Sequence, residues 1–198
     1  MPASDTLSPH APVASRFRRQ ITPHQAADLV GRKVGDRTPN VVGATLAEDM
    51  STGAPAFAYL PLSGDLDDVY DDSREAYALL AASLQDTLTR ASGTGDAVEA
   101  WKLVASVSWA PGVINTIEHG AGEYHRVTGR DPVWIAVPVF RCGVRGGYLD
   151  LPEYGATLET RHGWAALFPR DLVHGMSTAR QTREAGYLRS HFLVEDVG

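Results

Sequence analysis

The sequence holds one cysteine, Cys142, among its 198 residues. A single thiol excludes an internal disulfide, and this shortage is typical of proteins kept in a reducing compartment. The chain also lacks the run of about 18 uncharged apolar residues that a membrane-spanning helix needs. Its first 20 residues lack the apolar stretch of about 7–15 residues found in a secretory signal. We therefore expect one soluble, cytoplasmic domain that does not enter a membrane.

Positive charge is also scarce, since 18 Lys and Arg residues face 24 Asp and Glu residues, for a formal net charge of −6. The overall field of an acidic chain does not attract phosphate backbones, so nucleic acid would have to bind through a local patch. We therefore do not expect nucleic acid as a partner. The sequence contains neither G-x-G-x-x-G nor a P-loop motif, and it has no internal repeat of about 20–50 residues.

Local signals predict two helices in the N-terminal half of the chain. Thr22-Pro23-His24-Gln25 combines an N-cap hydroxyl, a proline at the first helical position and a Gln three residues after the cap, which predicts a short helix to about Val30. A second helix should begin near Ser73 and end at Gly93. One face of this helix carries apolar residues at helical spacing: Tyr77, Leu80, Ala81, Leu84 and Leu88.

From Trp101 onward, the apolar residues recur with a period of two, which is typical of strands. Seven short runs of this kind are separated by Gly, Pro and Asp. They are Trp101–Trp109, Gly112–Ile117, Val133–Phe140, Tyr148–Leu151, Ala156–Thr160, Trp164–Phe168 and Tyr187–Glu195. So many short strands in under 100 residues favour an antiparallel sandwich or barrel of the jelly-roll type.

The predicted fold class is therefore α+β and mainly β. Residues 1–20 show no apolar periodicity, and we expect them to form a flexible arm. Residues 21–198 form a single domain, with helical support over 21–100 followed by a β core over 101–198.

Histidines in the C-terminal half provide the motif with the most chemical content. His125 is followed after 21 residues by Gly146-Gly147-Tyr-Leu-Asp-Leu-Pro and after 49 residues by His174-Gly, and Arg189 follows His174 by 15 residues. This order and spacing resemble the double-stranded β-helix core of the Fe(II)/2-oxoglutarate-dependent oxygenases. The similarity is greatest to the branch of prolyl-hydroxylase-like proteins and relatives of the TET/JBP nucleobase oxidases, and it covers residues 110–195.

The resemblance implies that His125 and His174 bind iron, because a non-haem iron that activates O2 takes two neutral imidazoles and usually one carboxylate. The carboxylate of the family pattern lies two residues after the first histidine, where this chain has Val127. Three replacements are open. Asp131 could fold back toward the metal, Glu123 could share the strand face of His125, or the iron could bind through the two histidines alone.

The remaining site assignments also follow from the resemblance. Arg189 would bind the distal carboxylate of 2-oxoglutarate, because its planar guanidinium matches a carboxylate in a bidentate manner. His191 lies on the same strand face as Arg189 and could complete this site, as could Ser190. Asn115 is the candidate substrate contact.

The implied function is an Fe(II)/2-oxoglutarate-dependent dioxygenase that uses O2 to hydroxylate an unactivated C–H bond of a small molecule. Three alternatives stay open. A halogenase would share the fold and 2-oxoglutarate, and the absence of a carboxylate at Val127 suggests it. The others are a β-barrel binding protein without catalytic activity and a nucleobase oxidase. The sequence leaves the substrate and the oligomeric state undetermined.

Overall fold

The computed structural model describes residues 12–64, 66, 73–93, 99–111, 122–127, 129 and 133–196. The protein is mainly β, with a large mixed sheet and few helices, so the prediction of a mainly β fold is confirmed. The helices are α1 (Pro23–Ala27), α2 (Arg74–Ser92) and α3 (Glu99–Val104). The strands are β1 (Val13–Phe17), β2 (Thr45–Asp49), β3 (Pro55–Pro61), β4 (Ser108–Pro111), β5 (Trp134–Cys142), β6 (Val144–Gly146), β7 (Leu149–Leu151), β8 (Ala156–Leu158), β9 (Trp164–Pro169), β10 (Gly175–Met176), β11 (Ala179–Gln181), β12 (Tyr187–Ser190) and β13 (Leu193–Asp196).

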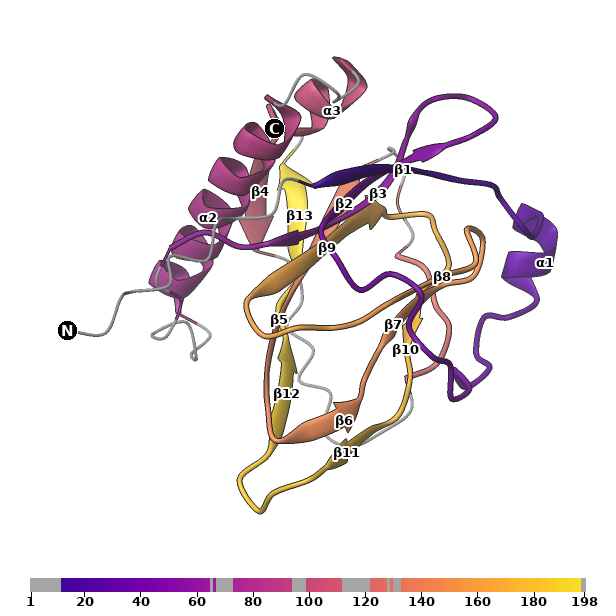
Figure 1. Ribbon diagram of the computed structural model, residues 1–198, viewed down its shortest axis with the longest axis vertical. Helices are drawn as coiled ribbons and strands as arrows, with labels where there is room; N and C mark the ends of the chain where they lie inside the picture. Colours follow the sequence, from indigo (N-terminus) through magenta and orange to yellow (C-terminus); the bar gives the residue numbers. More distant parts are fainter. Residues whose placement is uncertain are drawn as a thin grey trace.

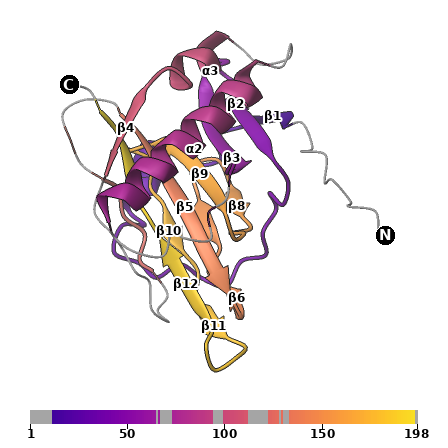
Figure 2. The ribbon, with the colours of Figure 1, turned by 90° about the vertical axis from the view of Figure 1, so that its left-hand side faces the viewer.

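The large sheet has the strand order β1-β2-β3-β9-β5-β13-β4, and β12 also pairs with β5 (Figure 1). β1 and β2 are parallel, whereas the other described pairings in this sheet are antiparallel. Figure 2 shows α2 lying across one face of this sheet. Apolar residues of α2 and of strands β3, β5 and β9 form one hydrophobic core there.

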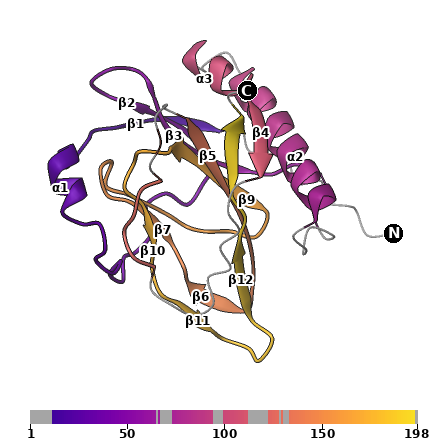
Figure 3. The same cartoon turned by 180° about the vertical axis from the view of Figure 1, so that it is seen from behind.

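Two smaller sheets, β10-β7-β8 and β11-β6, lie on the side of the large sheet away from α2 (Figure 3). A second hydrophobic core fills the space between the layers, with Phe57, Val137 and Phe168 from the large sheet and Leu149 and Met176 from the small one. The large sheet is therefore covered on both faces, which explains why most of its central strands read as continuous apolar runs.

Four pairings are nested along the C-terminal half. β4 pairs with β13, His125 forms a β-bridge with His174, β5 pairs with β9, and β7 pairs with β8. From the outermost pair to the innermost, the pairs lie alternately in the large sheet and in the layer of smaller sheets that faces it. The innermost pair is the β7–β8 hairpin. This nesting brings His125 and His174, which are 49 residues apart, into direct contact.

Helix α2 forms where the sequence predicts it. The side chain of Ser73 accepts a hydrogen bond from the Ala76 amide, and Gly93 is the C-cap. Leu84 is fully buried on the face that packs against the large sheet. Helix α1 has the predicted capping box between Thr22 and Gln25, although it ends at Ala27 rather than near Val30. In the described part of the chain, no helix combines the length and apolarity needed to cross a membrane.

Two expectations about the N-terminal half are wrong, and one strand there was missed. Residues 13–17 of the predicted flexible arm form β1, an edge strand of the large sheet. The segment over 21–100 is not only helical support, because it contributes β2 and β3 to the same sheet. β3 was missed because five of its seven residues are buried, so it shows no alternation of apolar and polar residues.

The strand predicted over Trp101–Trp109 is also wrong at its start. Glu99–Val104 is helix α3, whose buried residues are Trp101 and Val104, three apart as on one helix face. Leu103, which the strand pattern placed inside with Trp101, is 71% exposed. The predicted run Tyr187–Glu195 is divided into β12 and β13, and the predicted strand Gly112–Ile117 lies outside the described residues.

Candidate functional site

The structure brings together the two histidines that the sequence predicts as metal ligands. The amide of His125 donates to the carbonyl oxygen of His174, and the amide of His174 donates back to the carbonyl of His125, each over 2.9 Å. The centres of the two imidazole rings lie 4.3 Å apart, with 59° between the ring planes. The two side chains therefore project side by side from neighbouring strand segments.

The ring orientation of each histidine is set by a backbone carbonyl two residues earlier. His125 Nδ1 lies 2.9 Å from the carbonyl oxygen of Glu123, and His174 Nδ1 lies 3.0 Å from that of Leu172. A carbonyl oxygen only accepts hydrogen bonds, so in the neutral imidazoles Nδ1 carries the proton and Nε2 carries the free lone pair. Metal-binding histidines are commonly oriented in this way.

His174 is buried and held neutral. It is 1% exposed, and its Nε2 atom has no hydrogen-bond partner among the described residues. Burial lowers the pKa of His174 to about 4. The hydrogen bond to the Leu172 carbonyl acts in the opposite direction, because it favours the protonated form. The electrostatic effect of His125 lowers the pKa further. A neutral, buried imidazole with an unused lone pair can bind a metal ion without first losing a proton.

A cavity of about 340 Å³ adjoins the histidine pair. Its lining is mostly apolar and comes from both layers: Gly122, Glu123, His125, Val137, Leu149, His174, Gly175, Met176 and Phe192. The cavity therefore offers two imidazoles at the edge of an apolar space, a combination suited to an apolar ligand held beside a metal ion.

The spacing of the rings can be compared with that of a metal site. Two imidazoles bound through Nε2 at about 2.1 Å and at right angles to each other would place their ring centres about 4.6 Å apart. The observed 4.3 Å is close to this value. The ring-centre distance is therefore close to the one expected for imidazoles at two adjacent positions on one metal ion.

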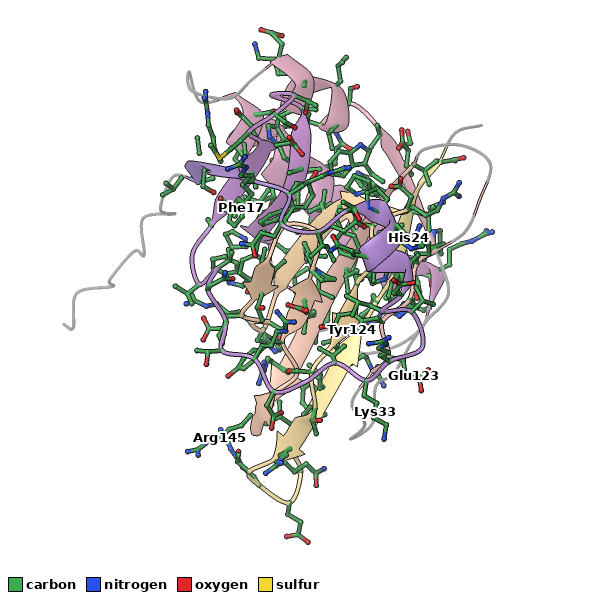
Figure 4. All side chains as sticks on the ribbon, turned by 90° about the vertical axis from the view of Figure 1, so that its right-hand side faces the viewer. Phe17, His24, Lys33, Glu123, Tyr124 and Arg145 are labelled. Atoms are coloured by element: carbon green, nitrogen blue, oxygen red, sulfur yellow. The ribbon has the colours of Figure 1, made fainter. Side chains whose placement is uncertain are left out.

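The third ligand is not found in the described part of the chain. There, no group of three or more His, Cys, Asp or Glu residues could hold a metal ion. Glu123 is exposed, its backbone pairs with Lys33, and it lines the same cavity as the two histidines, but it does not form a three-ligand group with them (Figure 4 labels Glu123 and Lys33). Val127, at the position of the family carboxylate, packs against the core between the sheets. Asp131 lies outside the described residues, as does Asn115, the predicted substrate contact.

Arg189 and His191 do not lie at this cavity, and their predicted role there is wrong. Arg189 is opposite Phe140 in the pairing of β12 with β5, and paired residues share a face of the sheet. Phe140 belongs to the core beneath α2, and the ring of His191 packs 5.5 Å from Phe140 and 5.6 Å from Tyr77 of α2. Both residues therefore lie on the face of the large sheet away from His125 and His174.

Sequence reasoning missed Arg141, a cation on the inner face of β5. It follows Val137 and Val139 at intervals of two, and this alternation could have revealed it. Its guanidinium donates to the carbonyl and hydroxyl oxygens of Thr160 over 2.7 and 2.5 Å, and to the carbonyl of Val144 over 2.9 Å. Burial lowers the pKa of Arg141, although a guanidinium stays charged at neutral pH.

A buried polar cluster behind His125 was also missed. The Tyr124 hydroxyl donates to Asp150 over 2.6 Å, and the hydroxyl of Thr157 donates to the same carboxylate over 2.7 Å. Asp150 is fully buried, and Arg37 lies 3.5 Å from it. Burial is the main reason that the pKa of Tyr124 is raised to about 12, so its hydroxyl stays a donor. The Asp150 carboxylate thus ties the segment carrying His125 to β7 and β8.

No protein-family model matches this chain, and no curated protein matches it significantly.

Proposed function

We propose that this protein is a non-haem Fe(II)/2-oxoglutarate-dependent oxygenase that hydroxylates an unactivated C–H bond of a small molecule. The observation that carries this proposal is the histidine pair. His125 and His174 lie in contact at a cavity, both Nδ1 atoms face backbone carbonyls, and Nε2 of the buried His174 has no partner among the described residues. Two neutral imidazoles with open neighbouring positions are the donor set that iron of this type takes.

The nested strand pairing supports the proposed fold. When a chain pairs its outermost segments, then the next inward, and the pairs alternate between two facing layers, the result is the arrangement of a jelly roll. β4 with β13, His125 with His174, β5 with β9 and β7 with β8 follow this order. We assign the C-terminal half to a double-stranded β-helix on this basis.

Arg141 replaces Arg189 as the proposed anchor for the distal carboxylate of 2-oxoglutarate. It lies on the same face of β5 as Val137, which lines the cavity, and the two are separated by about 13 Å along the strand. Its hydrogen bonds go to neutral oxygen atoms. Among the described residues, no carboxylate forms an ion pair with Arg141, although the charge of Glu159 acts to raise its pKa. A bound carboxylate would accept two hydrogen bonds from this half-buried guanidinium and balance its charge.

In this proposal the chain holds and shields the reactants. His125 and His174 would bind iron through Nε2, and the bound metal would supply oxidation by O2 coupled to decarboxylation of 2-oxoglutarate. The side chains of Leu149, Met176 and Phe192 would exclude water and hold the apolar part of the substrate.

Anaerobic titration with Fe(II) and 2-oxoglutarate tests the proposal. A weak visible charge-transfer band should appear, and succinate should form when O2 is admitted. His174→Ala should abolish both signals, Arg141→Gln should weaken 2-oxoglutarate binding, and His24→Ala should change neither because the His24 side chain is 90% exposed on α1. A folded wild-type protein that shows no band and no succinate would exclude this function.

A halogenase is the second candidate, because Val127 supplies an apolar side chain where the family pattern has a carboxylate. An anion could then occupy the metal position that the carboxylate leaves open. Reactions in chloride and in bromide separate the two candidates. A product whose mass changes with the halide indicates halogenation, and a gain of one oxygen atom in both salts indicates hydroxylation.

A further inference from the structure

We infer that the β6–β11 ribbon, together with the following turn over residues 182–186, is a docking surface for the phosphate backbone of a nucleic acid. This ribbon forms one tip of the molecule (Figure 1), and Arg145 projects from it away from the body of the protein (Figure 4). The inference is independent of the metal site and of the proposed function.

Two arginines lie directly opposite each other on the ribbon. In the antiparallel pairing of β11 with β6, Arg180 is the partner of Arg145. The partner of Gln181 is Val144, whose side chain packs toward the core, so Arg145 and Arg180 share the outer face. Like charges at directly opposite positions destabilise a strand pair unless an anion lies between them.

Arg183 adds a third guanidinium at the same tip. A Cβ placed on Gly143 would lie 2.9 Å from Arg183 Cγ, so the glycine leaves room for this side chain to cross the strand end. The Thr182 amide donates to the carbonyl of Gly143, and the Gly186 amide donates to the carbonyl of Arg183. The turn is therefore held in a defined conformation next to the paired arginines.

The three guanidinium groups are available to a ligand. Arg145, Arg180 and Arg183 are exposed, and in the described part of the chain no carboxylate forms an ion pair with any of them. The turn contains one acidic residue, Glu184, so the tip keeps an excess of positive charge in a chain whose net charge is −6. The overall charge, which argued against nucleic acid, therefore does not describe this surface.

The chemistry of the tip favours phosphate over other anionic partners. Its cations are all arginines, whose planar fork binds phosphate oxygens in pairs. In the described residues, the exposed large apolar side chains are Val13, Val30, Val42, Met50, Leu79 and Leu103, all outside the ribbon. Protein partners are usually anchored by apolar or aromatic side chains, and membrane insertion needs them. A two-stranded ribbon also fits the major groove of a duplex, which is about 12 Å wide.

Fluorescence anisotropy with a labelled 20-base-pair duplex of mixed sequence tests this inference. Three phosphate contacts predict that affinity falls about 40-fold between 50 and 200 mM salt, from a logarithmic slope of about −2.7. The combined variant R145Q/R180Q/R183Q should remove most of this affinity and flatten the slope, and R145K/R180K should keep part of it.

The matched control is R16Q/R18Q/R74Q, which removes the same charge from exposed positions outside the ribbon and should bind like the wild type. Thermal melting of each variant verifies folding. Three results would overturn the inference: absence of duplex binding at 50 mM salt, an equal loss in the control variant, or tighter binding to polyglutamate or to phosphatidylserine vesicles than to the duplex.

Discussion

Acidification of the metal-free protein should reduce its stability through His174. Its folded-state pKa of about 4 lies below the ordinary value of 6.5, because burial disfavours the charged form. Above pH 6.5 the residue is neutral in both the folded and the unfolded protein. As the pH falls from 6.5 toward 4, the unfolded chain binds a proton there and the folded chain does not. This difference in proton binding lowers the free energy of unfolding by about 2 kcal/mol at pH 5 and by about 3 kcal/mol at pH 4.

Urea unfolding with a chelator present, at pH 7, 6 and 5, measures this loss. Other groups also titrate in this range, so the informative quantity is the difference between the wild type and His174→Leu. The variant has no imidazole at this position, and its free energy of unfolding should fall by about 2 kcal/mol less between pH 7 and pH 5. His24→Leu, at an exposed position, should follow the wild type. Equal pH dependence in the wild type and His174→Leu would refute the reasoning.

Three further substitutions have defined outcomes. Tyr124→Phe removes the hydroxyl bonded to Asp150, which holds the segment next to His125, and should weaken Co(II) binding by up to about 10-fold, as followed by absorbance. Tyr154→Phe, at a buried tyrosine bonded to Asp49, should leave Co(II) binding unchanged. Leu84→Ala should lower the free energy of unfolding in urea by about 2–5 kcal/mol, because this side chain is fully buried beneath α2. Gly147→Ala should lower the melting temperature more than Gly53→Ala does. Both glycines have positive φ, but only at Gly147 would the new Cβ meet a side chain, 2.5 Å away.

Local chemistry made parts of the fold predictable from the sequence. The Ser73 cap, the spaced apolar face and Gly93 specify α2, because each signal acts over a few neighbouring residues. The strands from Val133 to Phe168 were predictable for the same reason, since apolar runs bounded by glycine and proline define them. The segment that contains Trp101 and Val104 was predicted as a strand but is helix α3. Its apolar residues alternate and also include a pair three apart, so the pattern is compatible with either a strand or a helix.

The candidate site was predictable only in part. His125 and His174 were identified by spacing and resemblance, and the structure places them in contact. Arg189 was assigned to the same site, but a residue on a strand that is buried on both faces gives no local sign of the face it occupies. The pairing of Arg189 with Phe140 placed Arg189 beneath α2. Arg141 alternates with Val137 and Val139 in the sequence, and the structure shows that these two valines face the core between the layers.

The sequence by itself determined the mainly β class, helix α2 and the two histidines, because capping, periodicity and residue chemistry are properties of short segments. Tertiary structure alone decided which side chains meet. The nested pairing brings His125 to His174, buries Nε2 of His174 and joins Tyr124 to Asp150. The separate pairing of β6 with β11 places Arg145 opposite Arg180 in a chain with net negative charge. These contacts depend on strand register between distant segments, and register is set by the packing of the two layers rather than by neighbours in the chain.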